Sequence, residues 1–424
     1  MSSSDTVLHP DEKTKAGPGV TKAKLMGYGA GAVLLGVGIA LGLIRGDSMQ
    51  RFLHSYLVAF TYFTSLAVGA LFFVIIMHLM GAKWSVVMRR IAECITMAFP
   101  LLALLSLGII VPILAGNDSL YIWTNEDFVK SSHLVHAKSG YLNPIFFSAR
   151  ILLYFAVWIF VSRYFYKTSV LQDETGDADL TRKMAKWSAP AMFAFAFSCA
   201  FFGFDLLMSI DPEWFSTMFG VVYFAGCCIS IFSLMVLIPY ALQRSGRLTH
   251  SITIEHYHDI GKLLFAFIFF WGYVAFSQFM LIWGANIPEE TGYFWKRWFS
   301  HVDEMGNWGW FTLAMMALHF VIPFVLLMSR FGKRRIKILA GFAIYMLAVH
   351  YMDLYWQVMP ALNNHGRAGL AEMSSIFGGF PMDIIVWAGM GLLFMGAVAS
   401  ALSKVTLIPI KDPGLKQSLK FENQ

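Results

Sequence analysis

Residues 201–220 read FFGFDLLMSIDPEWFSTMFG, an apolar segment that contains one carboxylate, Asp205, and then turns at Pro212. The same order, an Asp-Leu pair with a proline seven residues after the Asp, returns 148 residues later at Asp353 and Pro360. A charged residue at the centre of a membrane helix costs roughly 2.5 to 3.5 kcal/mol even on insertion scales. Two acids at matching positions therefore predict a duplicated membrane protein with one buried Asp in each half. The alternative is that both acids lie at helix ends and simply reach water.

The composition assigns the chain to the polytopic membrane proteins. Of its 424 residues, 57% are hydrophobic and 14% are charged, and the mean hydropathy is +0.61, a balance that soluble folds of this size do not have. The formal charge of +6 comes from basic residues in short loops between apolar runs, as membrane topology produces, so we expect no nucleic acid partner. The cysteines lack the spacing of zinc or iron–sulfur ligands, and we interpret them as core residues: Cys94, Cys199, Cys227 and Cys228.

Ten apolar runs are long enough to cross a membrane, since a helix needs about 20 apolar residues to span the hydrocarbon. They are 25–44, 52–80, 91–115, 143–166, 187–210, 214–242, 259–284, 306–328, 338–358 and 381–402. Ten crossings place both termini on one side. The loops and tails on that side hold 23 Lys and Arg residues and the other loops hold 7. Cytoplasmic loops keep the positive residues, so we expect cytoplasmic termini.

The duplication and the ten spans together predict an all-α membrane fold with two four-helix bundles, formed by spans 2 to 5 and spans 6 to 9. Because four is even, both copies enter the membrane in the same orientation, as a parallel repeat. Spans 1 and 10 carry small residues four apart, which mark faces that pack either on helices of the same chain or on partner subunits. The expected segments are a cytoplasmic tail (1–24), peripheral helix 1 (25–51), the first bundle (52–211), the second bundle (212–360), an outer loop with peripheral helix 10 (361–402) and a second cytoplasmic tail (403–424).

Polar residues inside the spans are the main candidates for a functional site, because intramembrane ionisable groups usually mark a proton, ion or ligand path. At 1.5 Å of rise per residue, Asp205 and Arg150 share a depth near the outer side and can pair. Asp353 lies at the equivalent level of the second bundle, one helical turn from the titratable His350. We expect Asp353 to carry protons and Asp205 to be structural. The full set is Asp205, Arg150, Asp353, His350, Gln278 and His319, of which His319 alone is more simply a core histidine.

A second polar group lies at the expected cytoplasmic ends of the spans. If it lines an inlet, it collects protons for the deeper acids; the alternative is that it solvates helix ends. Its members are His78, Glu93, His258, Asp259 and Lys262. Haem held between helices needs axial ligands at matched depth, whereas His54 lies near the outer surface and His78 near the inner one. We therefore expect neither haem nor metal in this chain.

Three stretches resemble the NrfD-like (polysulfide reductase type) family of quinone-interacting membrane subunits. The resemblance is closer to the F subunits of alternative complex III, the quinone-binding subunit 2 of quinol:cytochrome c oxidoreductases. The stretches are HSYLVAFTYFTSLAVGALFFVIIMHLMG at 54–81, FDLLMSIDPEWFSTMFG at 204–220 and HDIGKLLFAFIFFWGYVAFSQFMLIWGANIPEET at 258–291. The similarity runs from span 2 to span 9. It implies two four-helix bundles with peripheral helices in a bacterial inner membrane.

The resemblance also implies a function in respiratory electron transport. The chain would be a cofactor-free subunit of a multisubunit quinol:cytochrome c or oxidase-linked oxidoreductase, contributing to quinol binding or proton conduction without catalysing the reaction alone. The implied partners are an NrfD-like paralogous subunit, an iron–sulfur subunit, multihaem c-type cytochrome subunits, a terminal oxidase and membrane lipids, with haem and iron–sulfur clusters on those other subunits. Two further functions stay open: a secondary transporter with parallel repeats, and a structural anchor whose acids are inert.

A green fluorescent protein fused to the C-terminus is expected to fluoresce, because the Lys and Arg bias extends over all the loops and does not depend on one of them. An alkaline phosphatase fusion at the same position, which needs export for activity, is expected to be inactive. Phosphatase activity without fluorescence would contradict the topology.

Overall fold

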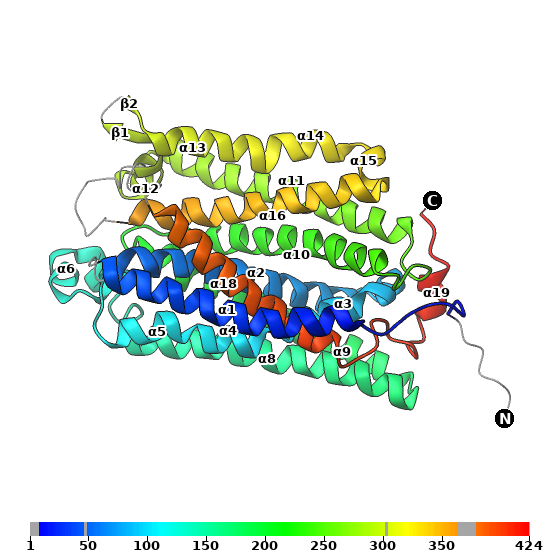
Figure 1. The fold of residues 1–424 in the computed structure, drawn as a ribbon. Helices are drawn as coiled ribbons and strands as arrows, with labels where there is room; N and C mark the ends of the chain where they lie inside the picture. Colours follow the sequence, from blue (N-terminus) through cyan, green and yellow to red (C-terminus); the bar gives the residue numbers. More distant parts are fainter. Residues whose placement is uncertain (1–7, 46–48, 302–303, 363–378, 424) are drawn as a thin grey trace.

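The computed structural model describes residues 8–45, 49–301, 304–362 and 379–423. Residues 1–7 of the expected tail and most of the expected outer loop, 363–378, lie outside this part of the chain. The described chain forms an elongated bundle of roughly antiparallel helices, and it starts and ends at the same end of that bundle (Figure 1). We refer to this end as the termini end and to the other as the opposite end.

Among the described residues, ten helical segments are long and apolar enough to cross a membrane, which confirms the all-α polytopic fold. They consist of α1 (Pro18–Arg45), α2 (Gln50–Leu79), α3 (Val86–Thr96) with α4 (Phe99–Leu105) and α5 (Leu107–Leu114), α8 (Pro144–Thr175), α9 (Asp179–Leu206), α10 (Phe219–Arg244), α11 (Ile254–Ala285), α13 (Asn307–Met316) with α14 (Ile322–Met328), α16 (Ile336–Val358) and α18 (Phe380–Leu402). The first helix begins at Pro18, seven residues before its apolar run, because proline suits the first turn of a helix.

Shorter elements connect the spans. They are η1 (Lys83–Ser85), η2 (Ile122–Thr124), α6 (Glu126–Ser131), α7 (His133–Ala137), η3 (Met208–Ile210), α12 (Pro288–Trp298), the antiparallel strands β1 (Phe299–His301) and β2 (Glu304–Met305), the π-helical turn η4 (Ala317–Val321), α15 (Arg330–Arg334), η5 (Met359–Ala361) and α19 (Leu415–Leu419). The helices α6, α7 and α12 and both strands lie at the opposite end, whereas α19 lies at the termini end (Figure 1).

Prolines account for the irregular spans. In span 3, Pro100 begins α4 and Pro112 lies inside α5, so that this span is built from three short helices. In span 8, Pro323 has no N–H to donate to the carbonyl four residues earlier, which belongs to His319. The helix adjusts through the π-helical turn η4, and His319 lies in the middle of it. Such turns often occur at functional sites.

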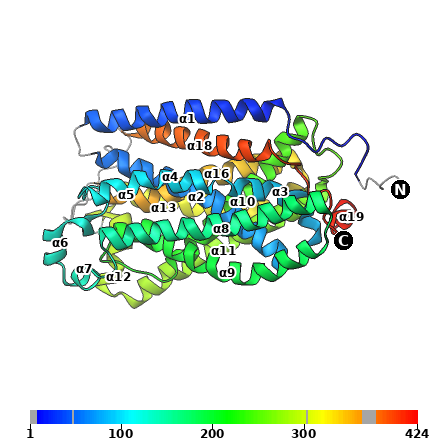
Figure 2. The ribbon, with the colours of Figure 1, turned by 90° about the horizontal axis from the view of Figure 1, so that it is seen from below.

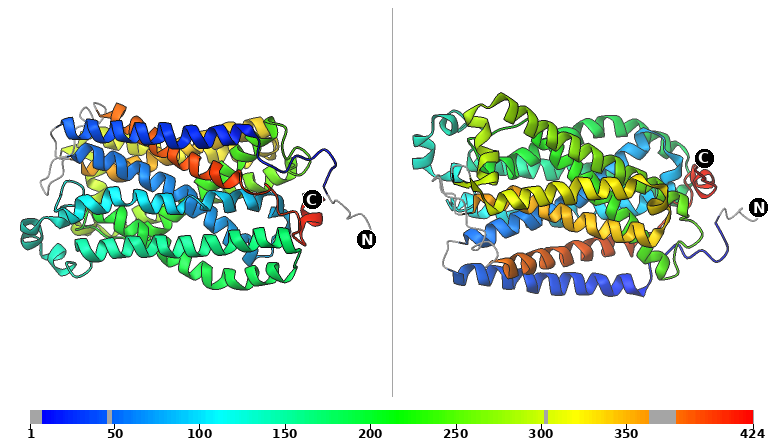
Figure 3. Two further views of the ribbon diagram at one scale, coloured as in Figure 1. Left: turned by 60° about the horizontal axis from the view of Figure 1, so that its bottom comes forward. Right: turned by 90° about the horizontal axis from the view of Figure 1, so that it is seen from above.

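The helices pack as two groups of four with one peripheral pair. Helices α2, α3, α8 and α9 pack on one another, as do α10, α11, α13–α14 and α16, and α2 contacts α10 where the groups meet. A Cβ at Gly69 of α2 would lie 2.2 Å from the Cys227 carbonyl oxygen of α10, so only glycine allows this close contact. Helices α1 and α18 run together along one side of the molecule (Figures 2 and 3).

Glycines form the seam between α1 and α18. A Cβ at Gly31 would lie 2.8 Å from the Gly389 carbonyl oxygen, and one at Gly27 would lie 2.8 Å from the Cα of Gly396. Backbones in a membrane approach this closely only through small residues. The sequence-based expectation that spans 1 and 10 are packing faces therefore corresponds to a contact that they make with each other.

Replacing Gly31 by leucine is expected to push α1 away from α18 and to lower the stability of the folded chain by about 1–3 kcal/mol, the usual cost of overpacking. Gly29 provides the matched control, because a Cβ there meets nothing within 4 Å, and Gly29→Leu should leave stability unchanged. Thermal unfolding in detergent measures both. Equal melting temperatures for the two variants would contradict a packed seam.

Candidate functional site

Asp205 and Arg150 form an ion pair inside the first bundle. Arg150 donates from Nε to Asp205 Oδ2 over 2.8 Å and from Nη2 to Oδ1 over 2.9 Å, and the Tyr154 hydroxyl donates to Oδ2 over 2.7 Å. The Tyr141 ring covers the guanidinium at 3.7 Å and its carbonyl accepts the remaining Nη1 donor. Two parallel charge-assisted hydrogen bonds make this a strong contact. The two residues that share a depth in the sequence are thus paired in the structure.

A second buried ion pair, which sequence analysis missed, joins α2 to α18. Asp383 accepts hydrogen bonds from Arg51 and Ser55 of α2 and from the Tyr355 hydroxyl of α16, the last over 3.0 Å. A Cβ at Gly379 would lie 2.3 Å from Arg51 Nε, so the chain before α18 needs glycine there. Asp383 lies in the first turn of α18, inside an apolar run. An acid inside an apolar run is also the sequence feature from which Asp205 was predicted.

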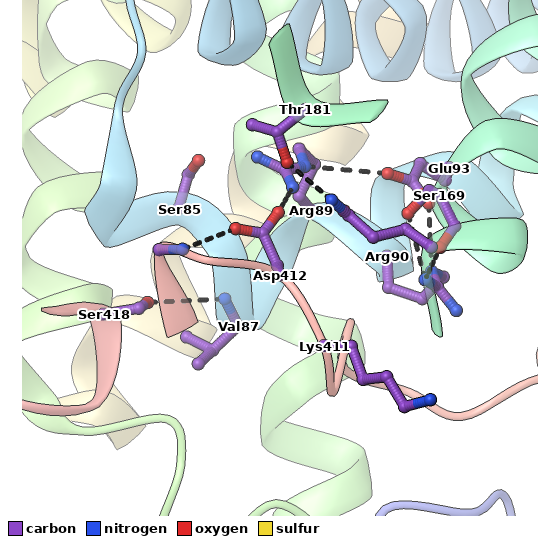
Figure 4. A network of polar contacts seen from close by, with 12 residues as sticks. Ser85, Val87, Arg89, Arg90, Glu93, Ser169, Thr181, Lys411, Asp412 and Ser418 are labelled. Atoms are coloured by element: carbon purple, nitrogen blue, oxygen red, sulfur yellow. Dashed lines mark hydrogen bonds and ion pairs between the residues drawn. The ribbon is translucent and has the colours of Figure 1, made fainter. Parts of the chain in front are cut away.

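At the termini end, Glu93 is enclosed by two arginines (Figure 4). Arg90 Nε lies 3.0 Å from Glu93 Oε2 and Arg89 Nε lies 3.6 Å from Oε1. Arg90 also pairs with Asp173 over 2.9 Å, and Arg89 pairs with Asp412 of the C-terminal segment 403–423. The Glu93 side chain is fully buried. In this structure the expected inlet acid is neutralised by its neighbours and covered by the C-terminal segment.

The other expected inlet residues fall into two groups. His78 belongs with Glu93 in the first bundle, where its ring stacks on Phe165 at 5.2 Å. His258, Asp259 and Lys262 lie in the first turns of α11 in the second bundle, and Asp259 and Lys262 pair with each other. The C-terminal segment reaches both groups, since Lys262 also donates to Asn423 over 2.8 Å.

Asp353 differs from every other buried acid in the described chain. Each of the others pairs with a Lys or Arg: Glu93, Asp205, Asp259, Asp383 and Asp412. Asp353 is only 4% exposed, yet no basic side chain of the described residues lies within ion-pair distance. Its polar neighbours are Gln357 and Trp271. The carboxylate faces a cavity of 480 Å³, which is within the roughly 300–1,000 Å³ of typical small-molecule sites.

This cavity, the Asp353 pocket, lies between α10, α11, α12, α13, η4 and α16 and is mostly apolar. Aromatic side chains form much of its wall: Phe219, Trp271, Phe276, Phe279, Tyr293, Phe294, Trp298, Phe320 and Trp356. The polar groups of the wall are Asp353, Gln278, Gln357 and Thr312. Two of the wall residues, Phe276 of α11 and Met316 of α13, are 54% and 42% exposed. The pocket therefore opens sideways toward the bilayer between α11 and α13.

A smaller polar cavity of 240 Å³ adjoins the Asp353 pocket at the opposite end. Tyr293 and Gln357 line both cavities, and the smaller one also contains Asp211, which pairs with Lys296 over 2.9 Å. Burial raises the pKa of Tyr293 to about 12, so its hydroxyl stays protonated at neutral pH. Arg297 has the largest electrostatic effect on this hydroxyl and opposes the rise, whereas Asp211 and Asp353 add to it. Tyr293 and Gln357 thus connect the unpaired acid to polar surroundings outside the spans.

The three remaining candidates have different positions. Gln278 lines the Asp353 pocket. His350 points away toward the first bundle, where its Nε2 lies 2.8 Å from the Ser65 hydroxyl oxygen. Within the described chain it forms no hydrogen bond or ion pair with Asp353. The His319 ring packs against the Trp271 ring at an angle of 41°, with the centroids 3.7 Å apart. Both His319 ring nitrogens are buried without a hydrogen-bond partner among the described residues.

The fold and the site define a polytopic membrane protein whose second bundle holds an unpaired carboxylate in an apolar pocket. Across the described ranges, no three His, Cys, Asp or Glu side chains gather as a set of metal ligands. No protein-family model matches the chain, and a search of curated proteins finds no significant relative. The function is therefore argued from the site.

Asp205→Asn is expected to lower stability by about 3–5 kcal/mol, because it leaves the buried Arg150 without its counter-charge. Asp353→Asn should change stability much less, since no cation depends on Asp353. Thermal unfolding of the purified variants in one detergent makes the comparison. Similar losses in both variants would show that Asp353 has a structural partner.

Proposed function

We propose that the chain binds the headgroup of a quinol in the Asp353 pocket, as the membrane subunit of a respiratory quinol oxidoreductase in a bacterial inner membrane. The observation that supports this most is the single uncompensated carboxylate in an apolar pocket that opens to the bilayer. A quinol is an apolar ring with two hydroxyl groups and a long hydrocarbon tail. The aromatic wall suits the ring, and the opening between α11 and α13 suits the tail.

The polar groups of the pocket supply what quinol oxidation needs from a protein. The reaction converts QH₂ to Q and releases two electrons and two protons. Asp353 accepts the proton of one hydroxyl and, after passing it on, the proton of the second hydroxyl. The amides of Gln278 and Gln357 orient the ring by hydrogen bonds. Iron–sulfur and haem centres of partner subunits, which the resemblance to NrfD-like subunits implies, would accept the two electrons. General-base groups of this kind accelerate reactions by about 10²–10⁴-fold.

The proton leaves through the smaller polar cavity. Tyr293 and Gln357 line both cavities, so a proton on Asp353 can move by way of these side chains to Asp211, whose surroundings include Lys296 and Glu213. With cytoplasmic termini, this cavity faces the outer side. The Asp205–Arg150 pair is structural in this proposal, and Glu93, held by two arginines, stabilises the cytoplasmic end.

A transporter is a weaker explanation of the same fold. Transporters with repeats use broken helices at equivalent positions of both halves. Span 3 is divided into α3, α4 and α5, but its counterpart in the second bundle, α11, is continuous over Ile254–Ala285. The irregular span of the second bundle is span 8, whose counterpart α8 is also continuous over Pro144–Thr175.

Asp353→Asn is expected to lower quinol-dependent electron transfer by about 10²-fold in membranes that contain normal amounts of the assembled complex. Asp127→Asn is the matched control, because Asp127 is an exposed acid at the same end of the molecule. A short-chain quinone should also quench the fluorescence of the pocket tryptophans in the purified chain. Wild-type turnover together with unchanged fluorescence would leave the inert anchor as the better description.

A further inference from the structure

A third cavity, which we call the α10–α18 crevice, lies on the other side of α10 from the Asp353 pocket. Its volume is 930 Å³, and almost all of its lining is apolar. One wall is α10, represented by Leu237 and Ala241, and the other is α18, represented by Trp387 and Met395; Tyr62 and Leu66 of α2 form its floor. The residues from α10 come from the last three turns of that helix, so the crevice occupies the half of the membrane next to the termini end.

The crevice is open to the bilayer along its length. Met395 is 55% exposed and Trp387 is 37% exposed, and Ala241 is exposed as well. Because the hydrocarbon region holds no water, an apolar crevice that opens there is filled by hydrocarbon chains. At its deep end the Tyr62 hydroxyl already donates to the Leu347 carbonyl over 3.3 Å. This end therefore suits a hydrocarbon chain better than a quinone headgroup.

The guanidinium of Arg247 lies at the end of the crevice next to the termini end of the molecule. Arg247 lines it together with Gly17 and Pro18. Its Nε donates to the Lys15 carbonyl over 3.0 Å and its Nη1 to the Ser245 carbonyl over 3.0 Å. A Cβ at Gly17 would lie 1.7 Å from Nη2, so glycine lets the guanidinium lie on the backbone at the start of α1.

The charge of Arg247 is not compensated by a carboxylate. Within the described chain its hydrogen bonds go to neutral oxygen atoms only, and no acidic side chain pairs with it. The first two turns of α1 add Lys22 and Lys24. A basic group at the membrane surface beside an apolar crevice is complementary to an anionic lipid, whose phosphate lies at the surface and whose chains lie in the hydrocarbon.

We propose that the α10–α18 crevice binds one anionic phospholipid of the cytoplasmic leaflet, with its acyl chains between α10 and α18 and its phosphate at Arg247. The lipid fills the space that the peripheral pair α1–α18 leaves against α10, and so joins that pair to the second bundle. This site is separate from the Asp353 pocket and does not depend on quinol binding there.

Native mass spectrometry of the full chain, purified in mild detergent and supplied with phosphatidylglycerol or phosphatidylcholine, tests the proposal. The wild type is expected to retain one phosphatidylglycerol in preference to phosphatidylcholine. Ala241→Trp, which fills the crevice, should abolish retention, whereas Val325→Trp on the exposed face of α14 should not. Arg247→Gln should weaken phosphatidylglycerol binding about fivefold, the effect of one basic residue near an anionic surface, and Arg182→Gln, an exposed arginine at the same end, should leave it unchanged.

The outcomes are distinct. Retention of phosphatidylglycerol by Ala241→Trp at the wild-type level, with an unchanged melting temperature, would overturn the site. A quinone or a second protein chain retained in place of phospholipid would overturn the assignment of the occupant. Equal retention of both phospholipids by the wild type would overturn the role of Arg247. Asp353→Asn should bind phosphatidylglycerol like the wild type, so failure of the quinol proposal and failure of this one are distinguishable.

Discussion

A buried charge in a membrane protein needs a counter-charge within reach, and this constraint organises much of the molecule. Asp205 holds α9 to α8 through Arg150, and Asp383 holds α18 to α2 through Arg51. At the termini end, Glu93 and its two arginines join α3 to the C-terminal segment. Breaking a buried pair costs several kcal/mol because one charge is then left alone. These ion pairs determine which helices are neighbours. Apolar helix faces specify neighbours poorly, because each of them can pack equally well against lipid.

Among the buried carboxylates of the described chain, Asp353 is the exception, because it has no basic partner and adjoins a pocket. The two acids of the repeated motif have thereby acquired different surroundings. Helix α9 ends at Leu206, directly after Asp205, whereas α16 continues to Val358, five residues beyond Asp353. The second acid consequently lies further inside its helix and faces aromatic side chains. Duplication of a sequence motif has not produced duplication of its chemistry.

The hydropathy of the sequence predicts the ten spans well, because the length of an apolar run is a local property. An equal depth in the membrane was sufficient to predict the pair of Arg150 and Asp205, because the helices that carry them are consecutive in the chain. It was not sufficient for Arg51 and Asp383, which lie on spans 2 and 10 with seven spans between them and meet only in the folded molecule. His350 lies one helical turn from Asp353, which suggested that the two side chains share a face of the helix. In the structure the His350 ring lies against α2, whereas Asp353 lines the pocket on the other side. The Asp353 pocket itself is formed by six separate elements, and no local pattern predicts such a cavity.

The glycine seam between α1 and α18 bears on how the chain is made. Gly31 and the Gly389 that it contacts are 358 positions apart, and at about 5–20 residues per second their synthesis is separated by roughly 20 to 70 s. Throughout that interval α1 is inserted without the helix that covers its glycines. A helix with exposed small residues in a membrane is open to association with other helices. The insertion machinery, or a chaperone within the membrane, is therefore expected to hold the first helix of this protein until the last one arrives.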